Sequence, residues 1–262
     1  MDNDLFKPGS RVVLRKTSLV DYPLCISAVI FFPGCNLRCP WCHNRDLALG
    51  KCGEEDTVTL EEAEAHIKKR RRVLGGVVLS GGEPTLFKDL GLLITRIKLY
   101  GLKVKIDTNG LLPGVLQSLI EKEETRPDYI AMDLKTSPDR YAELLPKKKD
   151  KNTGAENPDS EKSGKTENPG KAVIQSAAII RASGIAHEFR SLELPPLLTA
   201  PPLAAPQLAA PPPDNGQGAD HTSMPFFGKA DRMALAELAG DSPWHIRPFV
   251  PGNCIDPDWD NF

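Results

Sequence analysis

The sequence predicts an α/β protein folded as a partial (βα)6 barrel, an incomplete relative of the TIM barrel. Two observations lead to this prediction. Apolar segments of strand length alternate with segments of helical periodicity, an order typical of right-handed βαβ units around a parallel sheet. Only six such strands can be placed, fewer than the eight of a closed barrel. The chain has 262 residues, enough to bury one sizeable core.

The first half contains most of the expected elements. Residues 25–32, CISAVIFF, form a continuously apolar run that predicts a buried strand. A helix is expected over residues 59–74, because Thr59 and Glu62 form a capping-box pair and Gly75 follows the last apolar position. Further strands are expected at 76–80, 103–107 and 129–134, and helices at 86–97 and 113–120.

The second half adds two strands and two helices between two unusual segments. Helices are expected at 172–182 and 231–238, and strands at 187–194 and 244–249. Residues 147–170 have no apolar side chain larger than alanine, so we expect a disordered insertion. Residues 195–218 hold eight prolines, which favours an extended, solvated segment. The chain therefore divides into a first core part at 1–146, a polar insertion at 147–170, a core continuation at 171–194, a Pro-rich insertion at 195–228 and a C-terminal core segment at 229–262.

Composition excludes several classes of partner. The formal charge is −2, with 33 basic and 35 acidic residues, so no nucleic-acid partner is indicated. The basic run Lys68–Arg72 closes an expected helix, where cations favour the helix dipole. No apolar run approaches the ~20 residues of a membrane span, and no secretory signal is visible. We expect a reducing, cytoplasmic location, with Cys25 as a small buried apolar residue and no role for Cys52 or Cys254.

Three cysteines in ten residues carry the strongest chemical signal. Cys35, Cys39 and Cys42 have the spacing C-x3-C-x2-C and follow the first expected strand. Three thiolates can hold three irons of a 4Fe–4S cluster and leave the fourth iron open to an external ligand. The alternative is a partial zinc site completed by His43 or His66, since structural zinc normally takes four ligands.

Polar motifs follow the other expected strands. The run GGEP begins at Gly81, after the second strand, and DTNG begins at Asp107, after the third. Asp133 and Lys135 end the fourth strand, and Arg190 lies in the fifth. Because the carboxyl ends of parallel barrel strands share one face, these motifs and the cysteine loop predict a single site. Ordinary strand-end polarity is the alternative for each motif taken alone.

The motifs together resemble radical S-adenosylmethionine (SAM) enzymes. Cys42-His43-Asn44 points to the branch that activates glycyl-radical enzymes, and within it to activating proteins of anaerobic ribonucleoside-triphosphate reductase. The similarity covers most of residues 11–146 and two shorter C-terminal pieces. The matching segments are Lys16–Pro23, Pro33–Asn44, Leu79–Leu86, Lys103–Gly110, Asp128–Lys135, His187–Arg190 and Arg247–Pro257.

The resemblance implies cofactors and site residues. Cys35, Cys39 and Cys42 would ligate a 4Fe–4S cluster, and no catalytic residue is implied beyond the cluster and SAM site. The residues implied to bind SAM are Trp41, Gly81, Gly82, Glu83, Asp107, Thr108, Asn109, Asp133, Lys135 and Arg190. A monovalent cation held by Asp107, Thr108, Asp133 and Lys135 is a further hypothesis. Trp41 could instead be a core aromatic, and Arg190 could instead only pair with an acid.

The implied activity is reductive cleavage of SAM followed by formation of a glycyl radical. The implied partners are a glycyl-radical enzyme, namely anaerobic ribonucleotide reductase, and a flavodoxin-type reductant. Two other functions stay open at this point: a radical SAM enzyme acting on a small molecule, such as a deazapurine synthase, and a zinc-stabilised binding module.

Overall fold

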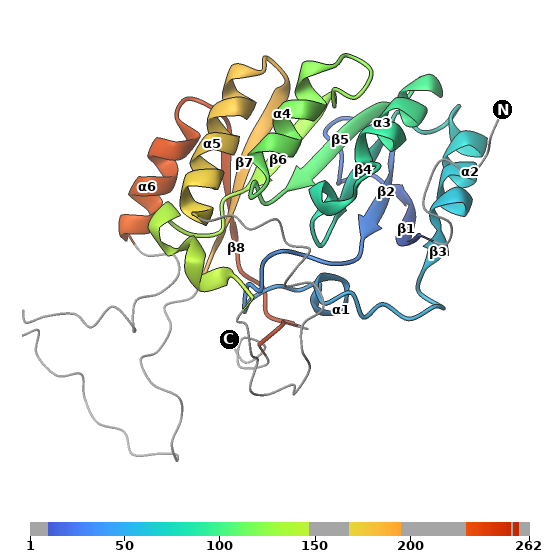
Figure 1. Ribbon diagram of the computed structural model, residues 1–262. Coiled ribbons are helices and arrows are strands. Elements are labelled where there is room, and N and C mark those ends of the chain that lie inside the picture. Colours follow the sequence, from blue (N-terminus) through green and yellow to red (C-terminus); the bar gives the residue numbers. More distant parts are fainter. Residues whose placement is uncertain (1–9, 147–167, 195–228, 253, 257–262) are drawn as a thin grey trace, which may run out of the picture.

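The computed structural model describes residues 10–146, 168–194, 229–252 and 254–256, which form one α/β unit around an eight-stranded sheet (Figure 1). The strand order is β3-β1-β2-β4-β5-β6-β7-β8. The strands are β1 (Arg11–Ser18), β2 (Ser27–Phe32), β3 (Val58–Thr59), β4 (Gly76–Gly81), β5 (Lys103–Thr108), β6 (Tyr129–Asp133), β7 (Ala186–Glu193) and β8 (Trp244–Pro248). The helices are α1 (Arg45–Ala48), α2 (Leu60–Arg70), α3 (Leu90–Leu99), α4 (Pro113–Glu121), α5 (Pro169–Ala182) and α6 (Lys229–Ala239), with 3-10 helices at η1 (Pro84–Leu86) and η2 (Pro138–Leu144).

The predicted partial barrel is confirmed in its parallel part. Strands β2, β4, β5, β6, β7 and β8 pair in parallel, each with the next, as βαβ units require. Two strands that were not predicted, β1 and β3, extend the sheet beyond β2. Strand β1 pairs antiparallel with β2 and with the two-residue β3. The sequence RVVLRKTS of β1 is mostly polar after Leu14, which is why an apolar-run criterion misses it.

Several element boundaries differ from the prediction for local reasons. The capping box of α2 is present, with Glu62 N donating to Thr59 Oγ1 at 3.1 Å and Thr59 N donating to Glu62 Oε2 at 2.8 Å. This helix ends at Arg70 and α3 begins only at Leu90, after the 3-10 helix η1. Pro169 and Gly170, expected in the polar insertion, instead open α5, where Lys171 N donates to the Asn168 side chain at 2.9 Å. The rest of that insertion, 147–167, and residues 195–228 lie outside the described residues.

The two faces of the sheet differ in chemistry. Helices α2 to α6 cover one face and pack two large apolar clusters against it, one around Ile30, Leu79 and Ile106 and one around Met132 and Phe189 (Figure 1). The opposite face carries a small apolar group of Tyr22, Val29 and Val78 and, beyond it, charged side chains. No helix among the described residues is both long and apolar enough to cross a bilayer.

Candidate active site

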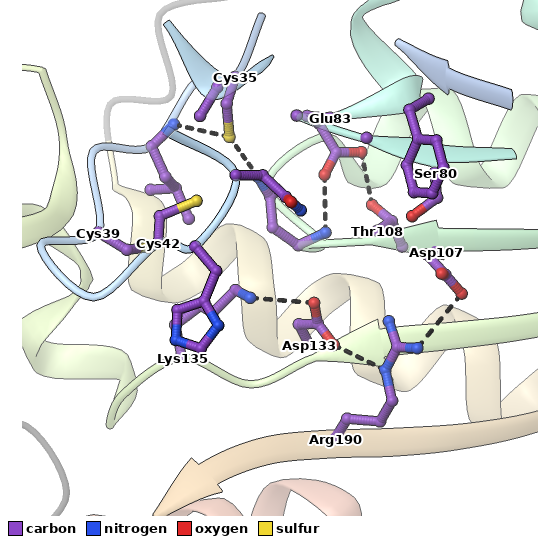
Figure 2. Close-up of a pocket in the computed structure, with 18 of the residues that line it drawn as sticks. Cys35, Cys39, Cys42, Ser80, Glu83, Asp107, Thr108, Asp133, Lys135 and Arg190 are labelled. Carbon is purple, nitrogen blue, oxygen red and sulfur yellow. Dashed lines mark hydrogen bonds and ion pairs between the residues drawn. The ribbon is translucent and has the colours of Figure 1, made fainter. Parts of the chain in front are cut away.

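One cavity of about 380 Å³ lies where the carboxyl ends of the parallel strands meet (Figure 2). We call this edge of the sheet the rim. The volume falls within the range of small-molecule sites. The cavity is lined by every site residue that the sequence predicted: Cys35, Cys39, Trp41, Cys42, Gly81, Gly82, Glu83, Asp107, Thr108, Asn109, Asp133, Lys135 and Arg190. The structure therefore brings together motifs that are separated by up to a hundred and fifty-five positions, from Cys35 to Arg190 (190 − 35).

The three cysteines occupy the loop that follows β2. Cys42 N donates to Cys39 O at 3.1 Å, and Leu37 N donates to Cys35 Sγ at 3.4 Å, so the loop folds back on itself. Burial raises the pKa of Cys35 to about 12 and raises the pKa of Cys39 as well. Thiols in this setting stay protonated unless a bound cation displaces the protons, as iron does when it forms thiolate bonds. All three cysteines are free of disulfides.

The glycine pair after β4 is required by close contact with the cysteine loop. A Cβ on Gly82 would lie 1.9 Å from Gly34 O, and Gly81 has a φ of +126°. Glu83 N also donates to Gly34 O at 2.9 Å. Only glycine allows the backbone to approach this closely in that conformation. The GGEP turn thus sets one wall of the cavity directly against the cysteine loop.

Glu83 organises the hydrogen-bonded side of the cavity. Its side chain is 1% exposed and its carboxylate accepts hydrogen bonds from Thr85 N at 3.1 Å, Thr85 Oγ1 at 2.5 Å, Thr108 Oγ1 at 2.8 Å and Asn109 N at 2.7 Å. We call Glu83, Thr85, Thr108 and Asn109 the Glu83 network. Burial raises the pKa of Glu83, and the hydrogen bonds oppose that shift only in part. The carboxylate is committed to this network, so Glu83 orients the turn.

Asn109 connects the Glu83 network to the cysteine loop. Its Nδ2 donates to Asn36 Oδ1 at 2.7 Å and lies 3.7 Å from Cys35 Sγ, while its Oδ1 accepts from Leu111 N at 3.0 Å. Asn36 is itself buried. Asn109 therefore positions the cysteine loop, a role that adds to the ligand contact predicted from DTNG.

The opposite side of the cavity is charged. Arg190 bridges two acids, with Nε 2.8 Å from Asp133 Oδ1 and Nη1 3.4 Å from Asp107 Oδ1, and Lys135 Nζ lies 2.9 Å from Asp133 Oδ2 (Figure 2). We call these four residues the ion-paired group. Burial opposes ionisation of Asp133, but Arg190 and Lys135 outweigh it and hold its pKa well below the usual range. Asp133 in turn raises the pKa values of Lys135 and Arg190 against the effect of burial.

Lys105 is a site residue that the sequence reasoning missed. It lies on β5 two residues before Asp107, its side chain is 3% exposed, and its Nζ is 2.9 Å from Asp107 Oδ1. Lysine is almost never fully buried unless it is paired. A lysine in the middle of KVKID, flanked by Val104 and Ile106, was the available signal for an inward-facing cation.

Three further residues that the sequence analysis discussed, two aromatic and one thiol, can now be placed. Trp41 is 2% exposed and belongs to the larger apolar cluster while also lining the cavity. The ring of His43, next to Cys42, meets the ring of Phe249 edge-on at 5.3 Å. Cys25 is half-buried against Gly75, with Sγ 2.6 Å from the place where a Cβ of that glycine would be.

The C-terminal segment covers the cysteine loop, which the sequence did not indicate. Asp256 N donates to Pro40 O at 3.0 Å, and Cys254 is 1% exposed in the same apolar cluster as Cys39 and Trp41. Cys254, to which the sequence assigned no role, is thus a packing residue beneath this loop.

Comparison with known proteins finds a similarity to one superfamily. Residues 29–155 match the family model described as the Radical SAM superfamily. Residues 29–155, just under half of the chain, are therefore similar to the radical SAM superfamily. The match contains the cysteine loop, the GGEP turn and the ends of β5 and β6.

Two curated relatives carry related names. A Methanocaldococcus jannaschii protein provisionally named a glycyl-radical enzyme activating enzyme is 43% identical over 129 residues, which is 49% of this chain and 51% of the relative. The pyruvate formate-lyase-activating enzyme of Clostridium pasteurianum is 34% identical over 130 residues, 47% of this chain and 50% of the relative. The chain therefore spans about half the length of the curated relatives it matches.

A solved structure supports the fold. Streptococcus suis SuiB bound to S-adenosylmethionine aligns with a TM-score of 0.50 and 13% identity, over 86% of this chain and 42% of SuiB. At that identity the likeness concerns the architecture of the barrel.

The residues present fit the cofactors of the superfamily, a 4Fe–4S cluster and SAM. Three thiols from one loop supply the donor set of a cluster with one open iron. A side chain at Gly81 or Gly82 would collide with neighbouring backbone atoms, so the two glycines keep this wall of the cavity free of side chains. Asp107 Oδ1 is buried and lies 2.9 Å from Lys105 Nζ and 3.4 Å from Arg190 Nη1, so its charge is balanced by cations of the chain. No group of three His, Cys, Asp or Glu among the described residues is arranged for a single metal ion.

Proposed function

We propose that this protein is a radical SAM activating enzyme that forms a glycyl radical on a partner enzyme. Cys35, Cys39 and Cys42 would hold a 4Fe–4S cluster at the wall of the cavity that they line. The observation that carries the proposal is a single cavity with three thiols on one wall and the cations Lys135 and Arg190 on another. A SAM molecule presents a carboxylate, a sulfonium and a ribose, which need those two environments within one small volume.

The chain's own residues bind and orient the substrate. Gly81 and Gly82 allow the SAM methionyl group to approach the backbone beside the cysteine loop. Lys135 and Arg190 attract its carboxylate, and Asp107 accepts from its polar hydrogens. Trp41 and the buried loop exclude water from the cluster side. A bound 4Fe–4S cluster would supply the one-electron reduction that cleaves SAM to methionine and a 5′-deoxyadenosyl radical.

The hydrogen donor in this proposal is a backbone glycine of a partner. Transfer of one hydrogen atom to the 5′ carbon releases 5′-deoxyadenosine and leaves the radical on that glycine. The names of the two curated relatives support this class of partner. The segments quoted above favour anaerobic ribonucleotide reductase as that enzyme and a flavodoxin-type protein as the electron donor. Both would meet this chain in a reducing cytoplasm.

Anaerobic reconstitution tests the proposal in two stages. Reconstituted protein should show a 4Fe–4S spectrum, and with SAM and reductant it should release 5′-deoxyadenosine. Addition of anaerobic ribonucleotide reductase should then give a stable glycyl-radical signal in electron paramagnetic resonance. Cys42→Ala should abolish both results, whereas Cys52→Ala, outside the cavity, should preserve them.

Each stage has its own contradicting result. A protein that binds zinc without sulfide would overturn the radical chemistry and favour a binding module. Release of 5′-deoxyadenosine without a radical on ribonucleotide reductase or pyruvate formate-lyase would overturn the partner class. Labelled hydrogen appearing in 5′-deoxyadenosine from a purine precursor would favour small-molecule chemistry instead.

A further inference from the structure

The ion-paired group does not fit the monovalent cation that the resemblance implied. Thr108, one of the four expected ligands, donates its hydroxyl to Glu83 Oε1 at 2.8 Å and accepts from Gly110 N at 3.1 Å. Asp107 and Asp133 are each already within 4 Å of two side-chain cations. The oxygen atoms that a metal ion would need at this place are therefore engaged by groups of the chain.

Lys105 places an ammonium group in an environment suited to a monovalent cation. Its Nζ lies 2.9 Å from Asp107 Oδ1, donates to Asp21 O at 2.7 Å, and stands 5.9 Å from the centre of the Tyr129 ring. A carboxylate oxygen, a carbonyl oxygen and an aromatic face are all attractive to a small cation. With 3% of the side chain exposed, Lys105 holds its charge inside the barrel rather than in solvent.

Asp107, Asp133 and the cations paired with them carry a positive surplus only when Lys105 is included. Asp107 and Asp133 contribute −2, and Lys105, Lys135 and Arg190 contribute +3, which leaves +1. Without Lys105 the sum is zero, and Asp107 has only the 3.4 Å contact with Arg190. A surplus of +1 attracts a ligand carboxylate, whereas a neutral group gives no such net attraction.

We propose that Lys105 is a built-in cation of the SAM site, which neutralises Asp107 in place of a monovalent metal ion. Lys105 is a positioning residue: it acts on SAM through Asp107 and Arg190. SAM binding by this protein is then independent of potassium. The inference rests on the proposed function only in taking SAM as the ligand of the cavity.

Three variants separate this role from a merely structural ion pair. Lys105→Ala removes the ammonium and leaves space beside Asp107 Oδ1 and Asp21 O for a cation to enter. Lys105→Met removes the charge but keeps the volume of the side chain, so the space stays filled. Lys103→Ala, in the same strand and exposed, is the matched control.

Two readouts are measured in KCl and in tetramethylammonium chloride at equal ionic strength. The first is the SAM dissociation constant of the anaerobically reconstituted protein. The second uses cluster-free protein: binding of thallium(I), a potassium mimic, followed by thallium-205 NMR. Wild type and Lys103→Ala should bind SAM equally within twofold in both salts and should show no bound thallium.

The variants should then diverge. Lys105→Ala should bind SAM roughly tenfold more weakly in tetramethylammonium, the size expected for one lost charged contact, and should regain most of that affinity in potassium. It should also bind thallium(I). Lys105→Met should be equally weak in both salts and should bind no thallium. This pattern, rescue by a metal ion only where space exists, is not expected of a purely structural pair.

Three results would overturn the inference. These are wild-type SAM affinity that falls more than twofold without potassium, a Lys105→Ala affinity equal to wild type in tetramethylammonium, and a Lys105→Ala defect that potassium does not relieve. If a variant does not fold, thallium binding to wild type alone decides, because a bound ion contradicts the proposal. Neither readout needs a partner enzyme, so a missing glycyl radical would not affect this test.

Discussion

The two sides of the cavity hold carboxylates in opposite ways. Glu83 is buried among neutral donors, and burial raises its pKa. Asp133 is surrounded by cations, and Arg190 and Lys135 keep its pKa low. The first arrangement fixes backbone geometry, since its donors come from two separate turns. The second arrangement keeps ionised groups at the cavity, so only that side is suited to attract an ionic ligand.

Breaking the Glu83 network should have the largest effect on stability. Glu83→Ala leaves the buried donors of Thr85, Thr108 and Asn109 without an acceptor, which should lower the free energy of unfolding by about 3 kcal/mol. Urea denaturation of cluster-free protein measures the change. Leu99→Ala, at an exposed position, is a control that should leave stability nearly unchanged. A loss below about 1 kcal/mol would contradict the anchoring role given to Glu83.

Disrupting the ion-paired group should instead lower the rate of the reaction. Arg190→Met leaves Asp107 and Asp133 without their shared cation, and the rate of 5′-deoxyadenosine release should fall roughly hundredfold, or about 2.7 kcal/mol. Arg190→Lys should recover part of that loss, because one ammonium can face only one acid well. Equal rates for Arg190→Met and wild type would show that Arg190 serves only as a structural partner of the two acids.

The contrast predicts opposite pH dependences for two carboxyl groups. Glu83 has a raised pKa in the fold, so its protonation stabilises the protein: the contribution is present at acid pH and is lost as pH rises through the folded pKa. Asp133 has a lowered pKa, so its contribution is present above about pH 4 and is lost as pH falls below that value.

Denaturation of cluster-free protein between pH 3 and 8 checks these signs. The stability of wild type relative to Glu83→Gln should increase as pH falls from neutrality. The stability of wild type relative to Asp133→Asn should decrease below about pH 4. Parallel curves for the two comparisons would refute the distinction between the two sides.

The smallest effect is expected outside both sides of the cavity. Thr59→Ala removes the capping box of α2 and should cost about 1 kcal/mol of stability. Because Thr59 does not line the cavity, SAM affinity should be unchanged. A change in SAM affinity with intact folding would show that α2 is coupled to the site.

The sequence predicted the parts of the molecule that depend on local patterns. The capping box at Thr59 and the run CISAVIFF mark their elements through periodicity and hydrogen-bonding chemistry, and the cysteine spacing marks its loop. The parallel order then places strand-end motifs at one rim. The sequence analysis failed where the outcome depends on tertiary contacts. It missed β1, a strand of mixed polarity between β2 and β3, and it placed Pro169–Gly170 in the insertion although they open α5 against Pro138.

The site was predicted as a set of residues but not as a set of partners. The sequence indicated Asp107 and Asp133 as site residues. Nothing in the sequence around them shows that Arg190 of β7 contacts both Asp107 of β5 and Asp133 of β6. The same holds for Glu83, whose motif suggested a ligand contact and which accepts two of its four hydrogen bonds from the end of β5. Such contacts belong to the tertiary fold, which single-sequence patterns do not encode.

The contact between Asp256 and Pro40 has a consequence for biosynthesis. The ribosome makes the cysteine loop early, but the segment that packs beneath it, with Cys254, only after β8 has been translated. The nascent chain therefore lacks this packing contact until the segment around Cys254 has been translated. Iron–sulfur assembly factors have that interval for access, and premature termination before Cys254 would yield a polypeptide whose thiols remain open to oxidation.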